Sequence, residues 1–398
     1  MPTLHFRNPK VDRAGPYRAD ATLNAAGFAA AEAEISSWPG YVPTPLVALP
    51  GLAAKLGLAT LWFKDEGKRF VTKSFKALGG PYAVGRVIQA AVERATGTRP
   101  TMRALAAGAH RDIARSITVT CATDGNHGRA VAWGATMFGA RAVIFVAEGV
   151  SQGRADAIAA YGAEVRRVAG SYDDAVRHAA ATAAAEGWTV VSDTSYEGYT
   201  EIPRDVMYGY GVMANEAIAQ LPAGTRPTHV FVHAGVGAWA AAMCARFWQV
   251  WGPARPRFVV VEPDKADALY RSARAGHPVV VPGPHDTVMG GLACGEISLL
   301  GWDVLETGTD DFLVIPDERA LEAMRSLASP AGGDPPVVAG ETGAASLGAV
   351  LAACADAKLR AALGLDAGAR VLLFGSEGAT DPAIYREIVG RPAEAVAG

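Results

Sequence analysis

Short apolar runs and longer amphipathic segments alternate along most of this chain. From residue 117 onward, short apolar stretches are followed by segments in which apolar residues recur every three or four positions. This alternation is typical of a parallel sheet whose strands are connected by helices that cover both faces. The sequence therefore predicts an α/β protein with two open twisted sheets and helices on both faces.

Two series of alternating elements follow one another. The first predicts strands at Ile117–Cys121, Ala142–Val146, Glu164–Val168 and Thr189–Ser192. Helices are expected between these strands, at Gly128–Met137, Gln152–Tyr161 and Tyr172–Ala185. The second series predicts a helix at Pro203–Gln220 and strands at His229–His233, Phe258–Val261, Phe312–Ile315 and Arg370–Phe374.

The first part of the chain has a weaker pattern. A strand at Leu61–Lys64 and an amphipathic helix at about Phe75–Ala95 are predicted. Residues 1–45 are interrupted by prolines and are expected to be irregular, with Tyr41–Leu46 extended. Gly97–Ala114 begins with polar and helix-breaking residues and is expected to be a loop or an insertion.

These series predict two domains. Residues 1–85 together with 200–398 are expected to form a large α/β domain, and residues 86–199 a small one. Ligands of open parallel sheets bind beyond the carboxyl ends of the strands, and two stacked sheets leave a cleft. The active site is therefore expected in the cleft between the domains.

Length and composition narrow the possible classes. A chain of 398 residues is too long for one ordinary core. A formal net charge of −3 without a basic cluster gives no reason to expect nucleic-acid binding. We find no apolar run that could span a bilayer and no signal peptide, so we expect a cytoplasmic protein without membrane association. The cysteines lack metal-binding spacing, so neither a metal site nor a disulfide framework is expected.

The loop Val119–Gly128 leaves a predicted strand and opens a predicted helix. Asn126 can donate to a phenolate or carboxylate oxygen, and exposed amides at the helix start attract anions. The alternative is an Asx turn in which Asp124 or Asn126 only caps the helix. That alternative does not need the flanking glycines, which favour a ligand-binding loop.

A second loop, Ala234-Gly235-Val236-Gly237-Ala238, also joins a predicted strand to a helix. Its backbone N–H groups lie at the positive end of the helix dipole and suit a phosphate. A dinucleotide fingerprint would look similar, but Ala240 stands where its third glycine is expected. A monophosphate is therefore favoured.

Lys76 lies between an aromatic residue and a short apolar, glycine-containing run, Ala77-Leu78-Gly79-Gly80. A lysine that bonds covalently to a carbonyl cofactor must lose its proton, which apolar neighbours favour. A surface lysine on an amphipathic helix is the alternative. The two loops, which suit an anion and a phosphate, favour covalent attachment of pyridoxal phosphate (PLP) to Lys76.

Ser376 follows the last strong strand, in Phe374-Gly375-Ser376-Glu377-Gly378. Its hydroxyl can hydrogen-bond the pyridine nitrogen of PLP without delivering a full proton, which makes the ring a weaker electron sink than an aspartate partner would. That suits elimination of a β-substituent. A solvent-exposed turn serine is the alternative.

The motifs Ser74-Phe75-Lys76, Asp124-Gly125-Asn126-His127-Gly128, Gly235-Val236-Gly237 and Gly375-Ser376-Glu377-Gly378 span nearly the whole chain. Together they resemble the tryptophan-synthase-β-like (fold type II) PLP enzymes. Within that superfamily the chain is most similar to the diaminopropionate ammonia-lyases. The narrower resemblance rests on Phe63–Gly80, Ala122–Arg129, Asp193–Pro203, Val261–Asp267 and Gly290–Glu296.

The resemblance implies functional roles for Asp124 and Asp193. Serine and threonine dehydratases typically carry a serine where this chain has Asp124. A carboxylate there can pair with the second ammonium of a diamino acid or remove a proton from Cα. The resemblance implies that Asp124 serves the D enantiomer and Asp193 the L enantiomer; a turn cap is the alternative for Asp193.

The expected site combines these residues. Catalysis is expected from Lys76, Asp124 and Asp193. Cofactor contacts are expected from Lys76, Phe75, Asn126, Ala234, Gly235, Val236, Gly237, Ala238 and Ser376. Substrate contacts are expected from Ser74, Thr123, Asp124, Asp193 and Thr194. Relatives often have a small hydroxyl residue where this chain has Ala238-Trp239, so backbone amides must supply more of the phosphate contacts.

The expected function is PLP-dependent α,β-elimination of 2,3-diaminopropionate, D, L or both, to pyruvate and two ammonia. The alternatives are a serine/threonine dehydratase or β-replacement enzyme acting on another β-substituted amino acid, a PLP-binding protein without turnover, and a nicotinamide oxidoreductase. The expected partner is a small amino-acid substrate, and the resemblance implies a homodimer.

Overall fold

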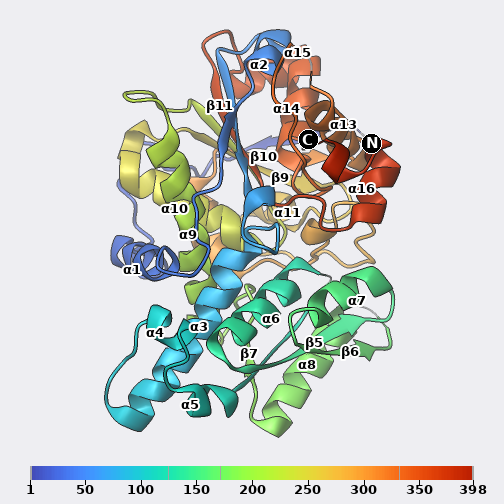
Figure 1. The fold of residues 1–398 in the computed structure, drawn as a ribbon. Coiled ribbons are helices and arrows are strands. Elements are labelled where there is room, and N and C mark those ends of the chain that lie inside the picture. The colour runs from blue at the N-terminus through green and yellow to red at the C-terminus, as the bar shows by residue number, and fades with distance from the viewer. Residues whose placement is uncertain (1, 124, 171, 331, 397–398) are drawn as a thin grey trace. The chain divides into compact units, whose positions relative to one another are not determined.

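The computed structural model describes residues 2–123, 125–170, 172–330 and 332–396 (Figure 1). Contacts within the chain divide it into two compact units. The large unit comprises residues 1–22, 43–74 and 213–398, and the small unit residues 23–42 and 75–212. Each unit has its own sheet with helices packed on it, as the sequence pattern predicted.

The sheet of the large unit has the strand order β1-β10-β9-β8-β11-β3-β2 among the described residues. Its strands are β1 (Leu4–Arg7), β2 (Leu46–Ala48), β3 (Thr60–Asp65), β8 (His229–His233), β9 (Arg257–Pro263), β10 (Asp311–Ile315) and β11 (Arg370–Gly375). The edge strands β1 and β2 are antiparallel to their neighbours, and the strands between them are parallel. The carboxyl ends of the parallel strands therefore lie at the same end of the sheet, where β8 leads into the glycine loop and β11 into Ser376.

Side chains of β11 alternate between two cores, as the pleat requires. Val371 and Leu373 pack in a cluster with residues of α2, α13, α14 and α16, whereas Phe374 contacts Trp239 and Phe247 of α10. Figure 1 shows α10 on one side of this sheet and α13 and α14 on the other. The helices are α2 (Pro50–Leu56), α10 (Ala238–Trp251), α11 (Ala268–Ala275), α12 (Leu299–Gly308), α13 (Asp317–Ala328), α14 (Ala345–Ala355), α15 (Ala357–Leu363) and α16 (Pro382–Val389).

The small unit has a parallel sheet of order β6-β5-β4-β7 among its described residues. Its strands are β4 (Thr118–Ala122), β5 (Arg141–Ala147), β6 (Glu164–Val168) and β7 (Thr189–Val190). Val143 and Phe145 of β5 pack with Ala179 of α8, whereas a Cβ at Gly128 of α6 would meet Ile144. Its helices are α1 (Ala25–Ile35), α3 (Lys76–Thr96), α4 (Met102–Ala106), α5 (Arg111–Arg115), α6 (Asn126–Phe138), α7 (Gln152–Ala159), α8 (Tyr172–Glu186) and the first part of α9 (Glu201–Gln220).

Two expectations were wrong. Residues 1–45 are not irregular throughout, because they contain β1 and α1. The Asn24 side chain accepts a hydrogen bond from Gly27 N at the start of α1, and Phe28 and Ile35 are buried along it. The segment Gly97–Ala114 is not simply a loop, because α4 and α5 lie within it. Thr101 caps α4 through Ala104 N, and such short helices carry too few residues for a clear period.

The contacts divide the chain at 74/75 and 212/213, whereas the sequence placed domain boundaries at 85/86 and 199/200. The helix α3 is continuous from Lys76 to Thr96 and packs along α6, so all of it belongs to the small unit. The helix α1 contacts α3 and α4 and is grouped with them. The boundary at 212/213 lies inside the helix α9. A helix that continues across a boundary keeps the same hydrophobic period on both sides, so the sequence pattern does not reveal the boundary.

Candidate active-site residues

Lys76 is the first residue of α3. Its Nζ forms an ion pair with Oδ2 of Asp193. The same Nζ lies 5.1 Å from the ring centroid of Phe75 and 5.4 Å from that of Tyr210. The Lys76 side chain is 18% exposed, so the amine is enclosed by a carboxylate and two aromatic rings instead of pointing freely into solvent.

Asp193 lies in the loop that follows β7. The Tyr210 hydroxyl donates a hydrogen bond to Oδ2 at 3.1 Å. Burial alone would raise the pKa of Asp193, but the Lys76 ammonium and the hydrogen bonds from Lys76 and Tyr210 hold it well below its usual range. Asp193 is therefore a carboxylate at neutral pH. Among the described residues its side chain accepts from Lys76 and Tyr210 and from no backbone N–H group, so it does not act as the turn cap that was the alternative.

The loop after β4 is organised by Thr123. Its Oγ1 accepts hydrogen bonds from Gly125 N and Gly128 N, both at 3.1 Å. A Cβ at Gly128 would lie 2.3 Å from Cγ2 of Thr123, so glycine is needed for this close approach. Asn126 begins α6. Asp124, a predicted catalytic residue, lies outside the described residues.

His127 received no role in the sequence analysis. Its Nε2 lies 2.8 Å from the Val191 carbonyl oxygen and so carries the proton, because a carbonyl only accepts. Its Nδ1 is buried without a hydrogen-bond partner among the described residues. Burial lowers the pKa of His127, so the ring is neutral at pH 7. The position directly after Asn126 in a glycine-flanked loop is the sequence signal that could have singled it out.

The glycine loop of the large unit joins β8 to α10. Gly237 caps α10 with φ +91° and, having no side chain, makes no side-chain cap hydrogen bond. A Cβ at Gly235 would lie 3.1 Å from both Cys294 Sγ and Gly291 O. The stretch Gly290–Glu296 therefore packs directly against the loop. The start of α10 offers backbone donors and a positive helix end, a combination that binds anions.

Ser376 is buried, so the alternative of a solvent-exposed turn serine is wrong. Its Oγ lies 2.7 Å from Nε2 of His233, whose Nδ1 lies 2.9 Å from Oγ of Ser346. Burial lowers the pKa of His233 to about 3, so the imidazole is neutral. His233 was missed because a histidine at the end of an apolar strand looks like an ordinary core residue.

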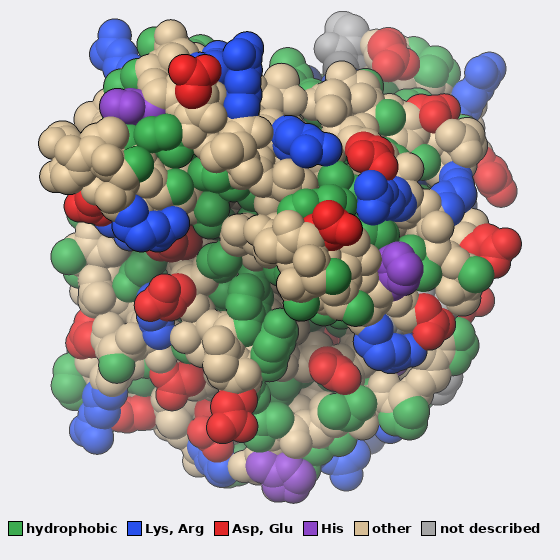
Figure 2. All heavy atoms as spheres, turned by 90° about the horizontal axis from the view of Figure 1, so that it is seen from below, with side chains coloured by type: hydrophobic (Ala, Val, Ile, Leu, Met, Phe, Trp, Pro, Cys, Tyr) green, Lys and Arg blue, Asp and Glu red, His purple; other side chains and the backbone are tan. Residues whose placement is uncertain are grey.

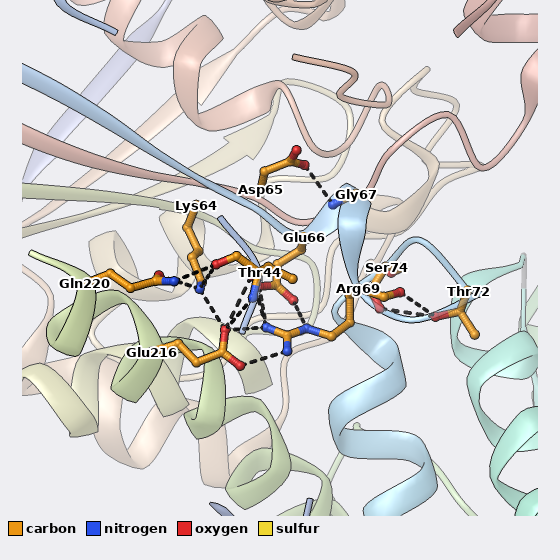
Figure 3. A network of polar contacts seen from close by, with 10 residues as sticks. All are labelled: Thr44, Lys64, Asp65, Glu66, Gly67, Arg69, Thr72, Ser74, Glu216 and Gln220. Atoms are coloured by element: carbon orange, nitrogen blue, oxygen red, sulfur yellow. Dashed lines mark hydrogen bonds and ion pairs between the residues drawn. The ribbon is translucent and has the colours of Figure 1, made fainter. Parts of the chain in front are cut away.

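A cluster of buried charges lies at the end of β3 in the large unit (Figure 3). Arg69 Nε contacts Glu66 Oε2 at 2.8 Å, and Arg69 Nη2 contacts Glu216 Oε2 at 2.7 Å. Lys64 Nζ contacts the same Glu216 oxygen at 2.7 Å. The Thr44 hydroxyl donates to Glu66 at 2.6 Å. Two bases thus face two acids, all nearly inaccessible to solvent.

The segment Phe70–Ser74 connects this cluster to Lys76. Phe70 and Lys73 have φ values of 45° and 55°, which non-glycine residues rarely adopt. Gly378 N donates to Lys73 O at 3.0 Å, and Ser74 forms an antiparallel bridge with Glu377. A strained segment is therefore held at both ends, and Ser74 lies beside the loop that carries Ser376.

Comparison with known proteins shows the family to which this chain belongs. A family model described as "Pyridoxal-phosphate dependent enzyme" matches residues 37–376. The diaminopropionate ammonia-lyase of Escherichia coli (strain K12) is 42% identical over 363 residues, which cover 90% of this chain and 90% of that protein. The chain belongs to the diaminopropionate ammonia-lyases, within the PLP-dependent enzymes.

Solved structures of this family match both units. The holo diaminopropionate ammonia lyase from Escherichia coli has a TM-score of 0.90 and 37% identity, over 100% of this chain and 99% of that one. The same enzyme in complex with an aminoacrylate-PLP azomethine reaction intermediate has a TM-score of 0.86 and 36% identity, over 98% and 97% of the two chains. The predicted fold type II architecture is confirmed.

The residues of this ammonia-lyase fit the cofactor of its family. Lys76 supplies a primary amine at the start of an ordered helix. The start of α10, with no side-chain cap and only tight space for a Cβ at Gly235, supplies donors for a phosphate. Ser376 supplies a buried hydroxyl held by a neutral imidazole. These are the groups that attachment of PLP, binding of its phosphate and contact with its ring nitrogen require.

Proposed function

We propose that this enzyme catalyses the α,β-elimination of 2,3-diaminopropionate to pyruvate and two molecules of ammonia, with PLP as cofactor. The observation that carries the proposal is the Lys76–Asp193 pair, in a chain 42% identical to diaminopropionate ammonia-lyase over 90% of its length. The pair sets an amine for cofactor attachment beside a carboxylate that can accept a proton.

Each part of the cofactor has residues suited to hold it. Lys76 would hold it covalently through Nζ, with Phe75 and Asn126 contacting its ring. Backbone N–H groups of Ala234–Ala238 would bind the phosphate, since this loop has no hydroxyl side chain. Ser376 would donate a hydrogen bond to the ring nitrogen. When bound, the cofactor withdraws electrons from Cα of the substrate, which acidifies the α-proton and promotes departure of the β-amine.

The carboxylates accept the α-proton. Asp193, kept ionised beside Lys76, accepts it from the L enantiomer, and Asp124 accepts it from the D enantiomer. Ser74, Thr123 and Thr194 would contact the substrate. Lys76 Nζ delivers a proton to the β-amine, which leaves as ammonia. The released aminoacrylate takes up water and gives pyruvate and the second ammonia.

Absorbance and pyruvate formation, followed in one cuvette, test this function. The purified protein is expected to show the near-visible absorbance of bound PLP. Addition of D- or L-2,3-diaminopropionate should change that absorbance and release pyruvate with two ammonia per turnover. D- and L-serine serve as comparison substrates, and a dehydratase would favour them.

The control is Lys76→Ala, which should bind no cofactor covalently and form no pyruvate. Borohydride reduction of the wild type followed by peptide mapping should place the cofactor label at Lys76. Absence of pyruvate from both enantiomers, or wild-type turnover by Lys76→Ala, would refute the proposal.

We also propose that the enzyme is a cytoplasmic homodimer. Family resemblance supports the dimer, and light scattering coupled to size exclusion tests it; a monomeric mass would contradict it. Among the described residues, Cys121, Cys244 and Cys354 are free thiols, which suits a reducing compartment. No described helix has both the length and the apolar character needed to cross a membrane. Cell fractionation tests the location.

A further inference from the structure

Tyr210 of α9 contacts the Lys76–Asp193 pair in the small unit. Its side chain is fully buried, and its hydroxyl lies 3.1 Å from Oδ2 of Asp193, the oxygen that also pairs with Lys76. Its ring centroid lies 4.8 Å from that of Phe75. One tyrosine thus contacts the carboxylate, the amine and the residue before the amine.

The hydrogen bond between Tyr210 and Asp193 has one possible direction. An ionised carboxylate only accepts, so the phenol donates to Oδ2. Donation to a charged acceptor is stronger than a bond between neutral groups. Two donors therefore restrain Oδ2, whereas Oδ1 has no hydrogen bond to a described residue. The carboxylate is held in one orientation with one oxygen available.

We propose that Tyr210 is a positioning residue for proton transfer at Asp193: it restrains Oδ2 so that Oδ1 meets the α-hydrogen of the L substrate. This role rests on the proposed function. The Asp193 side chain remains 14% exposed, so a small molecule can reach it. The D enantiomer, whose proton goes to Asp124, does not use this hydrogen bond.

The groups that face Asp193 set its response to pH. Among the described residues they are Lys76 on α3, Cys121 on β4, His127 on α6, Tyr199 in the loop after β7 and Tyr210 on α9. Burial raises the pKa of Cys121 and of both tyrosines and lowers that of His127, so these four are neutral at pH 7. Removing the Tyr210 hydroxyl therefore weakens stabilisation of the carboxylate without changing the charge around it. The pKa of Asp193 should then rise.

The experiment compares Tyr210→Phe with Asp193→Asn and wild type in the full-length, PLP-loaded enzyme. Pyruvate formation is measured with both enantiomers over a series of pH values. Tyr210→Phe should lower kcat for the L enantiomer by about 10- to 100-fold, the effect of losing a hydrogen bond to a charged group. KM should change little, and the acid limb of the pH profile should move to higher pH. Asp193→Asn identifies independently which enantiomer depends on Asp193.

Tyr208→Phe is the matched control. It removes a buried tyrosine hydroxyl from the same helix, one that lies 3.3 Å from Asn24 N. The ratio of the two enantiomers and the acid limb should match the wild type. A readout independent of turnover is the infrared band of the Asp193 carboxylate, isolated as wild type minus Asp193→Asn in the cofactor-free protein. That band should shift in Tyr210→Phe and stay in place in Tyr208→Phe.

Two results would overturn the role of Tyr210 while leaving the elimination intact. One is an equal loss of kcat with both enantiomers, which indicates general damage. The other is an unchanged acid limb together with an unchanged carboxylate band. If wild type forms no pyruvate from the D enantiomer and none from the L enantiomer, the proposed function is refuted, and the role of Tyr210 with it.

Discussion

His233 shows how burial defines the chemistry of one side chain. Its ring nitrogens lie 2.9 Å from Ser346 Oγ and 2.7 Å from Ser376 Oγ. A neutral imidazole has one donor and one acceptor, so it can satisfy two hydroxyls at once. Because burial lowers the pKa of His233 to about 3, this arrangement persists at any pH at which the enzyme is expected to work. Ser376 thus keeps a partner of constant charge.

Replacement of His233 by Gln should reduce the acid sensitivity of the fold. The histidine pKa is about 3 in the fold and about 6.5 in the unfolded chain, so the unfolded chain takes up a proton first as pH falls. Stability present above about pH 6.5 is then lost on acidification, by about 2 kcal/mol at about pH 5. Gln keeps a donor and an acceptor but does not titrate.

Urea unfolding at neutral pH and at about pH 5 measures this difference. The fall in unfolding free energy between the two pH values should be about 2 kcal/mol smaller for His233→Gln than for wild type. His127 and His229, whose pKa values are also lowered by burial, are unchanged in both proteins and cancel. An identical fall in both proteins would contradict the neutral state of His233.

The segment that leads to Lys76 follows directly after the charge cluster at the end of β3. Arg69 bridges Glu66, three residues earlier, and Glu216 of α9 (Figure 3). Burial alone would lower the pKa of Arg69, but the two carboxylates raise it, so the guanidinium stays charged. The segment Phe70–Ser74 starts from this rigid point and contains two residues with positive φ. Its strain is tolerated because both ends are fixed.

Arg69→Met should destabilise the protein by about 3–5 kcal/mol, because Glu66 loses its cation and Glu216 keeps only Lys64. The matched control is Arg319→Met, which removes another pair of i,i+3 spacing and 2.8 Å separation, Arg319–Glu322. That pair is exposed and screened by water, so its loss should cost less than about 1 kcal/mol. Thermal unfolding of both variants measures the contrast, and equal effects would contradict the importance of burial.

The glycine loop depends on close backbone approach. Gly235→Ala places a Cβ 3.1 Å from Cys294 Sγ and Gly291 O, so it should destabilise the loop by about 1–3 kcal/mol and weaken cofactor binding. Gly153→Ala in α7 is the control, since a Cβ there meets nothing within 4 Å. It should stabilise its helix by about 0.5–1 kcal/mol. PLP titration and thermal unfolding distinguish the two, and normal PLP affinity of Gly235→Ala would contradict the first prediction.

Surface composition carries little functional signal in this protein. Figure 2 shows acidic and basic side chains interspersed over one face, with apolar side chains among them. This mixture agrees with a net charge of −3 and with the absence of a basic cluster from the sequence. The chemistry instead lies in side chains that are largely buried, such as Lys76, Asp193 and Ser376.

At the scale of the whole molecule, local pattern predicted most of the strands but not their order. The last strand, β11, lies between β8 and β3, and β1 pairs with β10. These pairings join segments that are far apart in the sequence through backbone hydrogen bonds, which have no residue signature. The short edge strands β1 and β2 lack the length that gives a visible pattern.

For the site residues, too, the sequence did not show which side chains contact one another. Lys76 was singled out by its local sequence together with the glycine loops, and Asp193 by the family resemblance, but neither showed that their ion pair joins the start of α3 to the loop after β7. Tyr210 and His233 were missed, because each lies inside an apolar element where its polar atom leaves no trace in the hydrophobic period. Arg69 was missed because a buried arginine and an exposed one look alike in sequence.

The sequence by itself determined the α/β class, the positions of the strands from residue 117 onward, the helices between residues 117 and 220 and the glycine loops, because each depends on neighbouring residues and on short-range backbone preferences. Tertiary structure alone decided the strand order, the neutral state of His233 and the pairing of Lys76 with Asp193 and Tyr210. Those features depend on which distant groups share a buried space, and burial is what strengthens their hydrogen bonds and shifts their pKa values.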